Sequence, residues 1–287
     1  MSWSLRDRTV LITGAARGIG AESARQLRAK GARLALAGLE PELLERRAAE
    51  LGGDVAWFEV DVTDRDALDA AVAGTVERFG GIDVVIANAG VAPNGPVATI
   101  DPAVFERTIE VNLLGVWRTV RAALPHVVAR RGYVLPIASV AAAVHPPLMA
   151  AYTASKAGVE AFADSLRGEL AHTGTAVGCA YFGFIDTDMV RRSFERRSAQ
   201  MGQERGGLGR LGSWASVESA GAAVVRGIEH RARKVYAPRW VLPALYLRTL
   251  VQPLSERAGR KDVLEAMRLA AAEPTELTTP QPGRLRT

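Results

Sequence analysis

The fold is decided by one stretch near the N-terminus, Thr9-Val10-Leu11-Ile12-Thr13-Gly14-Ala15-Ala16-Arg17-Gly18-Ile19-Gly20. Its first five residues are apolar or β-branched and predict a buried strand of a parallel sheet. A glycine-rich loop follows at once, and residues 21–30 have the spacing of a helix. The order strand, glycine loop, helix makes the glycine motif a specific signal. In that order the glycines let backbone N–H groups approach a pyrophosphate at the N-terminus of the helix. The stretch therefore predicts a dinucleotide site that includes Gly14, Arg17, Gly18, Ile19 and Gly20.

The alternation of strand and helix continues beyond this unit. Further strands are predicted at residues 33–37, 55–60 and 83–87, with helices at residues 41–51 and 64–79 between them. Such a βαβ order predicts an α/β fold, a Rossmann-type doubly wound parallel sheet with helices on both faces and right-handed crossovers. Ligands bind such sheets just past the carboxyl ends of the strands. Asp61, Asn88 and Gly90 each follow a predicted strand and are therefore candidate binding residues.

The second half of the chain extends this pattern. A helical stretch at residues 102–131 contains Asn112, a strand at residues 133–138 leads to Ser139, and a helix begins at Ala150. Strands at residues 175–181 and 234–237 bring the sheet to about seven strands. The rest is an apolar helical segment and then a proline-containing tail with the composition of a disordered region. We therefore expect one Rossmann-fold domain at residues 1–239 and a C-terminal extension at residues 240–287.

Composition limits the class of protein. Of 287 residues, 48% are hydrophobic and 23% are charged, which suits a globular protein with a sizeable core. The single cysteine, Cys179, excludes an intramolecular disulfide framework and a metal site built from cysteines, and no metal is expected. The N-terminus lacks an apolar signal core and no apolar run reaches the roughly 20 residues that span a bilayer, so a cytoplasmic location is expected.

The net charge of +5 is unevenly distributed along the chain. Residues 191–287 carry 18 Lys and Arg against 9 Asp and Glu, whereas residues 1–190 are slightly acidic. A basic segment can meet nucleic acid, an anionic membrane or an acidic ligand, but it is more often a solvated arginine-rich surface. Because the charge is spread over the whole segment without interleaved aromatic residues, no nucleic-acid partner is expected.

Tyr152 and Lys156 lie four residues apart in the run Ala151-Tyr152-Thr153-Ala154-Ser155-Lys156. On a helix that spacing places the two side chains one above the other on one face. An ammonium group beside a phenol favours the phenolate, so we expect the pKa of Tyr152 to fall from about 10 toward neutral pH, as suits a general acid/base. Taken alone, such a pair is more often a solvated lysine beside a half-buried tyrosine.

Six motifs together are more specific than any one of them. They are the glycine loop from Thr13 to Gly20, Asp61-Val62, Asn88-Ala89-Gly90, Asn112, Ser139 and Tyr152-Thr153-Ala154-Ser155-Lys156. In this order and at these separations they resemble the short-chain dehydrogenase/reductase (SDR) family, and the resemblance covers about residues 5–237. One departure is Phe182, which stands where the family has a proline before Gly183. We expect this change to alter the local cofactor geometry or the shape of the substrate pocket.

The resemblance implies a role for each catalytic residue. Tyr152 would exchange a proton with the substrate oxygen, while Lys156 would lower the pKa of Tyr152 and hold the nicotinamide ribose. Ser139 would polarise the substrate carbonyl, and Asn112 would hold a water that links Lys156 to solvent. The chemistry agrees, because hydride arriving at a carbonyl builds an alkoxide that needs a nearby hydrogen-bond donor and a proton.

The resemblance also implies the cofactor contacts. Beyond the glycine loop, the adenine would meet Asp61 and Val62, the ribose side would be lined by Asn88, Ala89 and Gly90, and the nicotinamide carboxamide would meet Gly183, Ile185 and Thr187. The second strand ends in Gly38-Leu39, which offers neither an acid to bind the adenine ribose nor a base to bind a 2′-phosphate. Because Arg17 in the glycine loop can reach that phosphate, NADP is favoured over NAD.

The implied activity is that of an NAD(P)(H)-dependent oxidoreductase. Residues 92–97, 140–150 and 184–211 are expected to line the substrate pocket, and their apolar side chains favour a hydrophobic secondary alcohol or ketone. The candidate lining residues are Val91, Pro93, Val144, His145, Pro146, Leu148, Met149, Phe184 and Phe194, although His145 more often would be a loop surface residue. The alternative is a catalytically silent nucleotide-sensing regulator or binding protein on the same fold. Such proteins usually lose the tyrosine or the lysine, and this chain keeps both.

The resemblance further implies a homodimer or homotetramer, with the Tyr152 helix in one interface. The apolar segment at residues 240–254 is expected to cap the pocket or to pack in an oligomer interface. Contact of this segment with a membrane surface is less favoured, because Pro243 interrupts it and makes it a poor interfacial helix.

Overall fold

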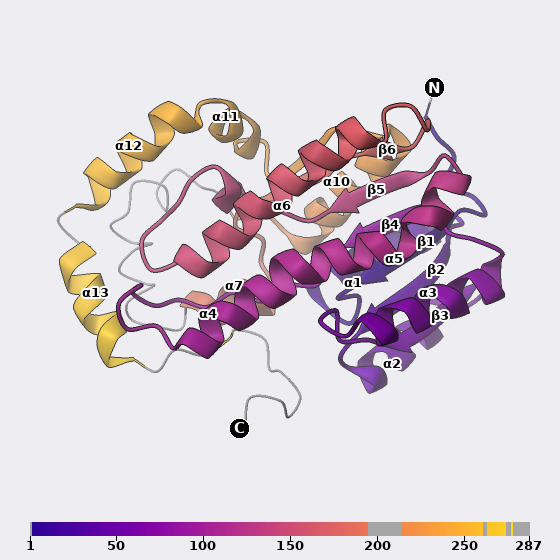
Figure 1. Cartoon of the computed structure of the whole chain (residues 1–287), viewed down its shortest axis with the longest axis horizontal. Helices are drawn as coiled ribbons and strands as arrows, with labels where there is room; N and C mark the ends of the chain where they lie inside the picture. Colours follow the sequence, from indigo (N-terminus) through magenta and orange to yellow (C-terminus); the bar gives the residue numbers. More distant parts are fainter. Residues whose placement is uncertain (1, 195–213, 261–262, 274–276, 278–287) are drawn as a thin grey trace.

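The computed structural model describes residues 2–194, 214–260, 263–273 and 277 (Figure 1). Its centre is a parallel sheet of six strands in the order β3-β2-β1-β4-β5-β6. The strands are β1 (Thr9–Thr13), β2 (Arg33–Gly38), β3 (Val55–Glu59), β4 (Val84–Ala87), β5 (Tyr133–Pro136) and β6 (Ala176–Val177). The strand order reverses between β1 and β4, and this is where sheets of this kind bind ligands. The predicted Rossmann-type α/β fold is confirmed.

Helices cover both faces of the sheet (Figure 1). One face carries α1 (Gly18–Ala29), α2 (Pro41–Leu51) and α10 (Val217–Glu229), with α1 and α10 packed together. The other face carries α3 (Arg65–Phe79), α5 (Gly115–Ala129) and α6 (Ala150–Glu169). The predicted long helix before β5 consists of α4 (Pro102–Ile109), a π-helical turn η1 (Glu110–Leu114) and α5. A short helix, α7 (Asp188–Phe194), follows strand β7 (Cys179–Phe182) in the sequence.

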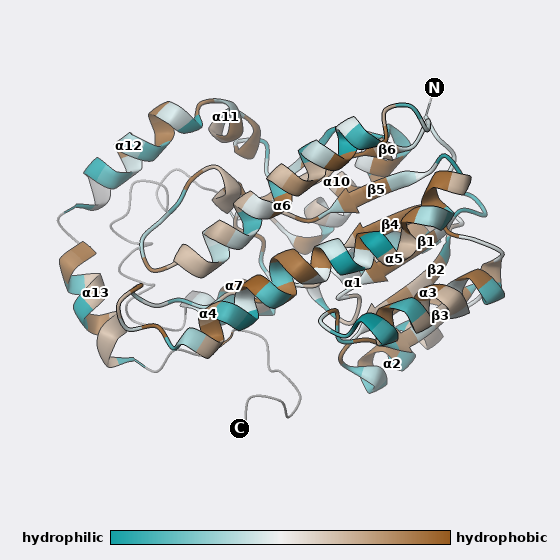
Figure 2. Ribbon diagram, in the orientation of Figure 1, coloured by the Kyte–Doolittle hydropathy of each residue, from teal (hydrophilic) through white to brown (hydrophobic). Residues whose placement is uncertain are grey.

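The strands bury alternate side chains on the two faces of the sheet. In β1, Val10 and Ile12 join the core beneath α1 and α10, whereas Leu11 joins the core beneath α3, α5 and α6. Because β1 is buried on both faces, its sequence is a continuous apolar run rather than an alternating one. The single cysteine, Cys179, is buried in the same core as Leu11. Figure 2 shows hydrophobic central strands between helices that carry both hydrophobic and hydrophilic residues.

The predicted strand at residues 175–181 is divided at Gly178. Its second part, β7 (Cys179–Phe182), pairs with β8 (Lys234–Ala237) in a two-stranded sheet, and a bridge from Ile137 to Ala180 continues the main sheet across the division. The Tyr133 side chain crosses this point and donates a hydrogen bond to the backbone of Ala232. A Cβ at position 178 would overlap the Tyr133 hydroxyl, so only glycine fits there. All seven predicted strands are therefore present, six of them in the main sheet.

The C-terminal extension begins inside the main core. Helix α11 (Val241–Tyr246) buries Val241 and Leu245 in the core that lies beneath α3, α5 and α6. It is followed by α12 (Arg248–Gly259) and α13 (Val263–Ala272), so the predicted helical segment continues to residue 272. The tail predicted to be disordered at residues 273–287 falls almost entirely outside the described residues.

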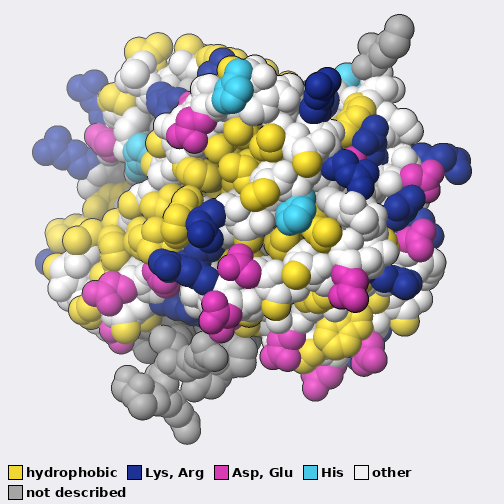
Figure 3. Space-filling model, turned by 45° about the vertical axis from the view of Figure 1, so that its right-hand side comes forward, with side chains coloured by type: hydrophobic (Ala, Val, Ile, Leu, Met, Phe, Trp, Pro, Cys, Tyr) yellow, Lys and Arg dark blue, Asp and Glu magenta, His cyan; other side chains and the backbone are white. Residues whose placement is uncertain are grey.

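The outer side of the extension is rich in exposed apolar side chains. Tyr246, Leu247, Leu250 and Leu254 are all at least half exposed. Within the described part of the chain, no helix has the length and the hydropathy that a transmembrane span requires. On the face shown in Figure 3, Lys and Arg side chains are interspersed with Asp and Glu and do not form one basic patch.

Candidate active site

The glycine loop between β1 and α1 has a shape that requires glycine at its key positions. Gly14 and Gly18 have positive φ angles of 64° and 57°, which other residues rarely adopt. A Cβ at Gly20 would overlap the carbonyl oxygen of Gly14 and would lie 2.7 Å from Asn88 Nδ2. That Nδ2 donates hydrogen bonds to the carbonyl oxygens of Thr13 and Gly14, at 3.0 and 3.1 Å. The Asn88 amide therefore ties the glycine loop to the loop after β4.

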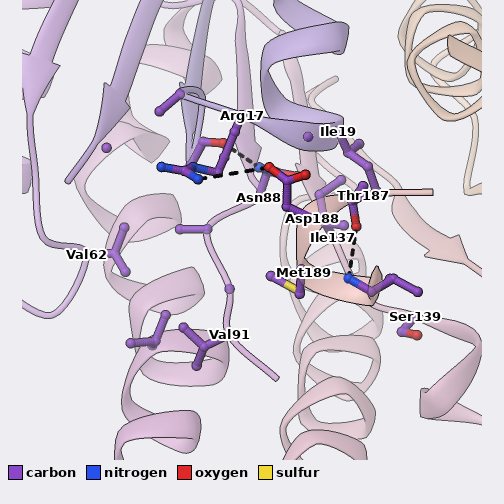
Figure 4. Close-up of a pocket in the computed structure, with 18 of the residues that line it drawn as sticks. Arg17, Ile19, Val62, Asn88, Val91, Ile137, Ser139, Thr187, Asp188 and Met189 are labelled. Carbon is purple, nitrogen blue, oxygen red and sulfur yellow. Dashed lines mark hydrogen bonds and ion pairs between the residues drawn. The ribbon is translucent and has the colours of Figure 1, made fainter. Parts of the chain in front are cut away.

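One pocket extends from the glycine loop across the carboxyl ends of the strands (Figure 4). It is lined by most of the predicted binding and catalytic residues: Gly14, Arg17, Gly18, Ile19, Asp61, Val62, Asn88, Ala89, Gly90, Ser139, Tyr152, Lys156, Gly183, Ile185 and Thr187. The other two predicted residues, Gly20 and Asn112, are not among the lining residues and contact the segments that form the wall. In Figure 4, Arg17 lies at one end of the pocket and Ser139 at the other.

Tyr152 and Lys156 lie in the first two turns of α6, as their spacing predicts. Lys156 is only 4% exposed, and its Nζ lies 5.7 Å from the centroid of the Tyr152 ring. The same Nζ donates a hydrogen bond of 2.9 Å to the carbonyl oxygen of Ile137, at the end of β5 (Figure 4). The buried ammonium group is therefore fixed between α6 and the central sheet.

Ser139 reaches the same end of the pocket from β5. Its Oγ accepts a hydrogen bond from the Ala141 N–H at 3.2 Å and so caps the short helix η2 (Val140–Ala142). The hydroxyl donates to the carbonyl oxygen of Phe182 at 3.2 Å and is hydrogen-bonded to the Tyr152 phenol. Three segments far apart in the sequence thus meet at one serine.

The pKa values of the pair differ from the expectation. Burial raises the pKa of Tyr152 above its ordinary value, and the hydrogen bond with Ser139 only partly offsets that rise. Burial also lowers the pKa of Lys156 to about 8. The predicted fall in the pKa of Tyr152 is therefore not seen: burial outweighs the groups that favour the phenolate, and Lys156 Nζ, which is directed to the Ile137 carbonyl, does not reverse the rise. With a raised pKa, Tyr152 is protonated at neutral pH and can donate that proton.

Asn112 is fully buried in the π-helical turn η1. Its Oδ1 accepts a hydrogen bond from the Val91 N–H and its Nδ2 donates to the Val91 carbonyl, both at 2.8 Å. The second amide hydrogen goes to Ser155 Oγ at 3.1 Å, so a water held between Asn112 and Lys156 would bind the backbone carbonyl or the second lone pair of Oδ1. A Cβ at Gly90 would lie 3.2 Å from Asn112 Oδ1 and 3.6 Å from Lys156 Nζ, so glycine brings this loop close to both groups.

The carboxylate of Asp61, which follows β3, is already engaged by protein groups. It accepts hydrogen bonds from the Thr63 N–H and hydroxyl, at 2.9 and 2.8 Å, and from Arg107 at 2.9 Å. Burial alone would raise the pKa of Asp61, but these donors and the Arg107 charge outweigh burial and lower it. Arg107 also lines the pocket and was not predicted. No local motif marks it, because it arrives from α4, 46 residues along the chain.

A second residue that the sequence analysis missed is Glu40. It lies two positions after the end of β2, lines the pocket and forms an ion pair with Arg17. Asp188 approaches the same guanidinium at 4.0 Å (Figure 4). From Gly38-Leu39 alone, no acid is predicted at this end of the site. The structure corrects this expectation, because two carboxylates surround the Arg17 charge.

The segment after β7 forms the remaining wall of the pocket, with Gly183, Ile185 and Thr187 as predicted. A Cβ at Gly183 would lie 2.7 Å from the Trp240 ring, so the loop and the C-terminal segment pack closely here. Phe182 is 4% exposed and belongs to the core beneath α1 and α10, and only its carbonyl oxygen is bonded to Ser139. Phe182 therefore packs in the core, also lines the pocket, and accepts the Ser139 hydroxyl through its carbonyl oxygen.

Some of the residues predicted to line the substrate pocket lie outside the described part of the chain. Val91 lines the pocket, Val144 is buried in the main core, and His145 is exposed at the surface, as a loop residue more often would be. The side chain of Phe194 and residues 195–211 lie outside the described residues. Met189 and Val190 of α7 add apolar lining that the sequence analysis did not single out.

A glycine loop, a pocket at the strand ends and a serine, tyrosine and lysine at its far end together define a dinucleotide-dependent type of oxidoreductase site. Comparison with protein families leads to the same class of protein: the family model described as short chain dehydrogenase matches residues 8–198. The protein therefore belongs to the short-chain dehydrogenase/reductase family of oxidoreductases.

Individual relatives extend this result. The chain is 37% identical over 190 residues to nodulation protein G of Rhizobium sp. (strain N33), which is 66% of this chain and 77% of that protein. It is 38% identical over 193 residues to trans-4-hydroxycyclohexanecarboxylate dehydrogenase of Sinomonas cyclohexanicum, covering 64% and 74% of the two chains. A crystal structure of an SDR protein from Burkholderia phymatum in complex with NAD covers 86% of this chain and 94% of its own, with a TM-score of 0.76 and 24% identity. At that identity the likeness shows the fold alone.

Proposed function

We propose that this protein is an NAD(P)(H)-dependent oxidoreductase that interconverts a hydrophobic secondary alcohol and the corresponding ketone, with Tyr152 as the general acid/base. The observation that carries the proposal is one pocket that joins the glycine loop to Ser139, Tyr152 and Lys156. Membership of the family supports oxidoreductase chemistry of this kind. The dehydrogenase from Sinomonas supports an alcohol as one of the two substrates.

The pocket suits a nicotinamide dinucleotide. A Cβ at Gly14 would lie 2.9 Å from the Ala89 backbone, so glycine lets the loop pack closely against the segment after β4. The backbone N–H groups of such a glycine loop can approach a pyrophosphate. The residues that would hold the cofactor are Gly14, Arg17, Gly18, Ile19, Gly20, Asp61, Val62, Asn88, Ala89, Gly90, Tyr152, Lys156, Gly183, Ile185 and Thr187. When bound, the cofactor would supply or accept the hydride, which no protein side chain does.

The protein side chains would then transfer one proton to or from the substrate oxygen. In reduction the substrate oxygen becomes an alkoxide, and Tyr152 gives it the phenolic proton that its raised pKa preserves at neutral pH. Ser139 would turn its hydroxyl from the Phe182 carbonyl to the substrate oxygen. Lys156, with Nζ 5.7 Å from the ring, would stabilise the phenolate that remains. In oxidation the proton moves in the opposite direction, and a water bound to Asn112 would carry it between Lys156 and solvent.

The pH dependence of reduction follows from the lowered pKa of Lys156. Above about pH 8 this side chain is mostly neutral and no longer stabilises the phenolate. We expect kcat/KM to fall about tenfold per pH unit above that point, as it does for a group that must stay protonated. Steady-state rates between pH 6 and 10 measure the profile. In Lys156→Arg the guanidinium stays charged, so the alkaline fall should vanish even though activity is lower. The same fall in this variant would contradict the assignment.

Arg17 and Glu40 are proposed to set the choice between NADP(H) and NAD(H). Arg17 supports NADP(H), whereas Glu40 weakens that preference, because a carboxylate at the adenine ribose repels a 2′-phosphate. Arg17→Ala is expected to raise KM for NADPH about tenfold or more, the value of one hydrogen bond to a charged group, with a much smaller effect on NADH. Glu40→Gln is the matched control and should lower KM for NADPH. Equal changes for both cofactors in Arg17→Ala would defeat the assignment.

A hydrophobic substrate is proposed from the apolar side chains that line the pocket, which include Val91, Met189 and Val190. Arg192 lines the same pocket, so an alcohol that bears a carboxylate is the second candidate. A panel of cyclic and open-chain ketones, in pairs with and without a carboxylate, tested with each cofactor, distinguishes them. Turnover confined to carboxylated members would overturn the hydrophobic assignment, and turnover of neither kind would favour a nucleotide-sensing protein.

The assembly and the domain division are proposals as well. We propose that residues 1–239 form the catalytic unit and residues 240–287 an extension that caps it. A homodimer or homotetramer with α6 in one interface is proposed from the family, and light scattering coupled to size exclusion tests it. We also propose that there is no nucleic-acid partner; on the one face shown in Figure 3, positive and negative side chains are interspersed.

A further inference from the structure

Gln252, on the C-terminal helix α12, makes a two-point pairing with the backbone of His145. Its side-chain oxygen accepts a hydrogen bond from the His145 N–H at 2.7 Å, and its side-chain nitrogen donates to the His145 carbonyl at 3.3 Å. The two residues are 107 positions apart in the sequence. One side chain thus binds both polar groups of a loop residue, as a neighbouring strand would.

The orientation of the Gln252 amide is fixed by its own helix. Its Nε2 also donates to Glu256 Oε1 at 2.7 Å, one turn further along α12. A reversed amide would direct its oxygen at the Glu256 carboxylate and its NH2 group at the His145 N–H, and both contacts are repulsive. Only the observed orientation satisfies both partners, so Gln252 presents an acceptor to the His145 N–H.

The paired loop connects two residues of the reaction centre. Residues 140–149 run from Ser139, at the end of β5, to the start of α6, where Tyr152 lies. The far part of the loop is held by one hydrogen bond of 2.8 Å from the Gly95 N–H to the Leu148 carbonyl. The middle of the loop, at His145, is held from outside by Gln252. In Figure 1, α12 lies on the outer side of this part of the molecule.

A second contact fixes α12 to the catalytic helix. Arg248 donates to Glu160 Oε2 at 2.9 Å and to Oε1 at 3.3 Å, and Glu160 lies one turn after Lys156 on α6. The Glu160 side chain is 9% exposed, and its Oε1 also accepts the Tyr181 hydroxyl at 3.0 Å. Helix α12 is therefore attached to α6 at Arg248, and one turn later it holds the loop at Gln252.

A second side-chain amide pairs with both backbone groups of a loop residue, on the cofactor side of the pocket. Asn112 binds both the N–H and the carbonyl of Val91 and so fixes the loop after β4. Gln252 binds both groups of His145 and so fixes the loop after β5. Two side-chain amides, one from the Rossmann fold and one from the extension, each secure one of the loops that flank the reaction centre.

We propose that Gln252 is a positioning residue for the reaction: it holds the loop at residues 140–149 so that Ser139 and Tyr152 face the substrate in one geometry. The inference rests on the proposed function. The extension thereby acts on the substrate half of the site and leaves the cofactor half alone. A small displacement of reacting groups costs up to about 100-fold in rate, so the loss of one loop tether has a measurable effect.

The test compares Gln252→Ala with Thr249→Ala, an exposed position on the same helix. Gln252→Ala is expected to lower kcat/KM for the ketone about tenfold through displacement of Ser139 and Tyr152, with unchanged NAD(P)H affinity by fluorescence titration. Hydrogen–deuterium exchange in peptides covering residues 140–149 should become faster in this variant and not in Thr249→Ala. The double variant Gln252→Glu/Glu256→Gln keeps the acceptor for the His145 N–H but puts a carboxylate oxygen beside the His145 carbonyl, so it should restore only part of the wild-type kcat/KM.

Two results would overturn the proposal. Unchanged exchange at residues 140–149 in Gln252→Ala means that the pairing does not hold the loop. Faster exchange with an unchanged kcat/KM for the ketone means that the pairing is structural only. The exchange measurement needs no substrate, so it remains informative if the ketone panel shows no turnover, and the failure of the proposed function is then distinguished from the failure of this one.

Discussion

Replacing Tyr152 by phenylalanine is expected to lower kcat for ketone reduction by about 10²–10⁴-fold, the usual contribution of a positioned general acid. The substitution removes only the hydroxyl, which carries the proton and is hydrogen-bonded to Ser139. The ring keeps its place beside Lys156 Nζ, so cofactor binding should change little. Single-turnover rates with NADPH or NADH measure the chemical step directly.

The control for this substitution is Tyr246→Phe, the same chemical change at a side chain that is 67% exposed on α11. It should leave kcat within about twofold, since surface substitutions away from special features are close to neutral. Fluorescence titration with the reduced cofactor shows whether Tyr152→Phe still binds it. Turnover near the wild-type rate in Tyr152→Phe, with binding intact, would remove the proposed mechanism and leave the nucleotide-sensing alternative.

Gly20→Ala is expected to abolish cofactor binding or to prevent folding, although it adds only one methyl group. The added Cβ would overlap the carbonyl oxygen of Gly14 and would lie 2.7 Å from Asn88 Nδ2. Backbone on one side and a doubly hydrogen-bonded amide on the other leave no room for adjustment. Overpacking of this kind costs about 1–3 kcal/mol and occasionally more. We expect at least a tenfold loss of cofactor affinity, or a chain that does not accumulate as folded protein.

Gly168→Ala is the matched control for this change. Gly168 is also a helical glycine, in α6, and a Cβ there would meet nothing within 4 Å. Replacing such a glycine by alanine should stabilise the helix by about 0.5–1 kcal/mol. Thermal unfolding therefore should move in opposite directions in the two variants. Equal melting temperatures for Gly20→Ala and the wild type would show that the loop can relax.

The fold was predictable because local patterns and global topology agree. β1 is apolar throughout, which predicts burial on both faces, and it lies centrally in the sheet between β2 and β4. The glycine loop could be predicted because Gly14 and Gly18 need positive φ angles. The division at Gly178 could not, since it depends on Tyr133, which reaches that point from another strand.

The candidate catalytic residues lie in the elements that the sequence predicts and line one pocket, but their electrostatics could not be predicted. The spacing of Tyr152 and Lys156 fixes the helix face, yet the direction of each pKa shift depends on burial and on the Ile137 carbonyl. Arg107 enters the site from another helix and has no local signature. Glu40 is different, because it lies close to the end of β2 and a slightly wider search of the sequence would have included it.

The burial of Cys179 also makes the protein suited to site-directed labelling. Its thiol lies in the core, and burial raises its pKa to about 12, so the reactive thiolate is nearly absent at neutral pH. Since the sequence has no other cysteine, one introduced at the exposed Thr249 would be the sole thiol to react with a maleimide dye. Such a dye on α12 would report movement of the C-terminal helices during turnover, with no need to remove the native residue first.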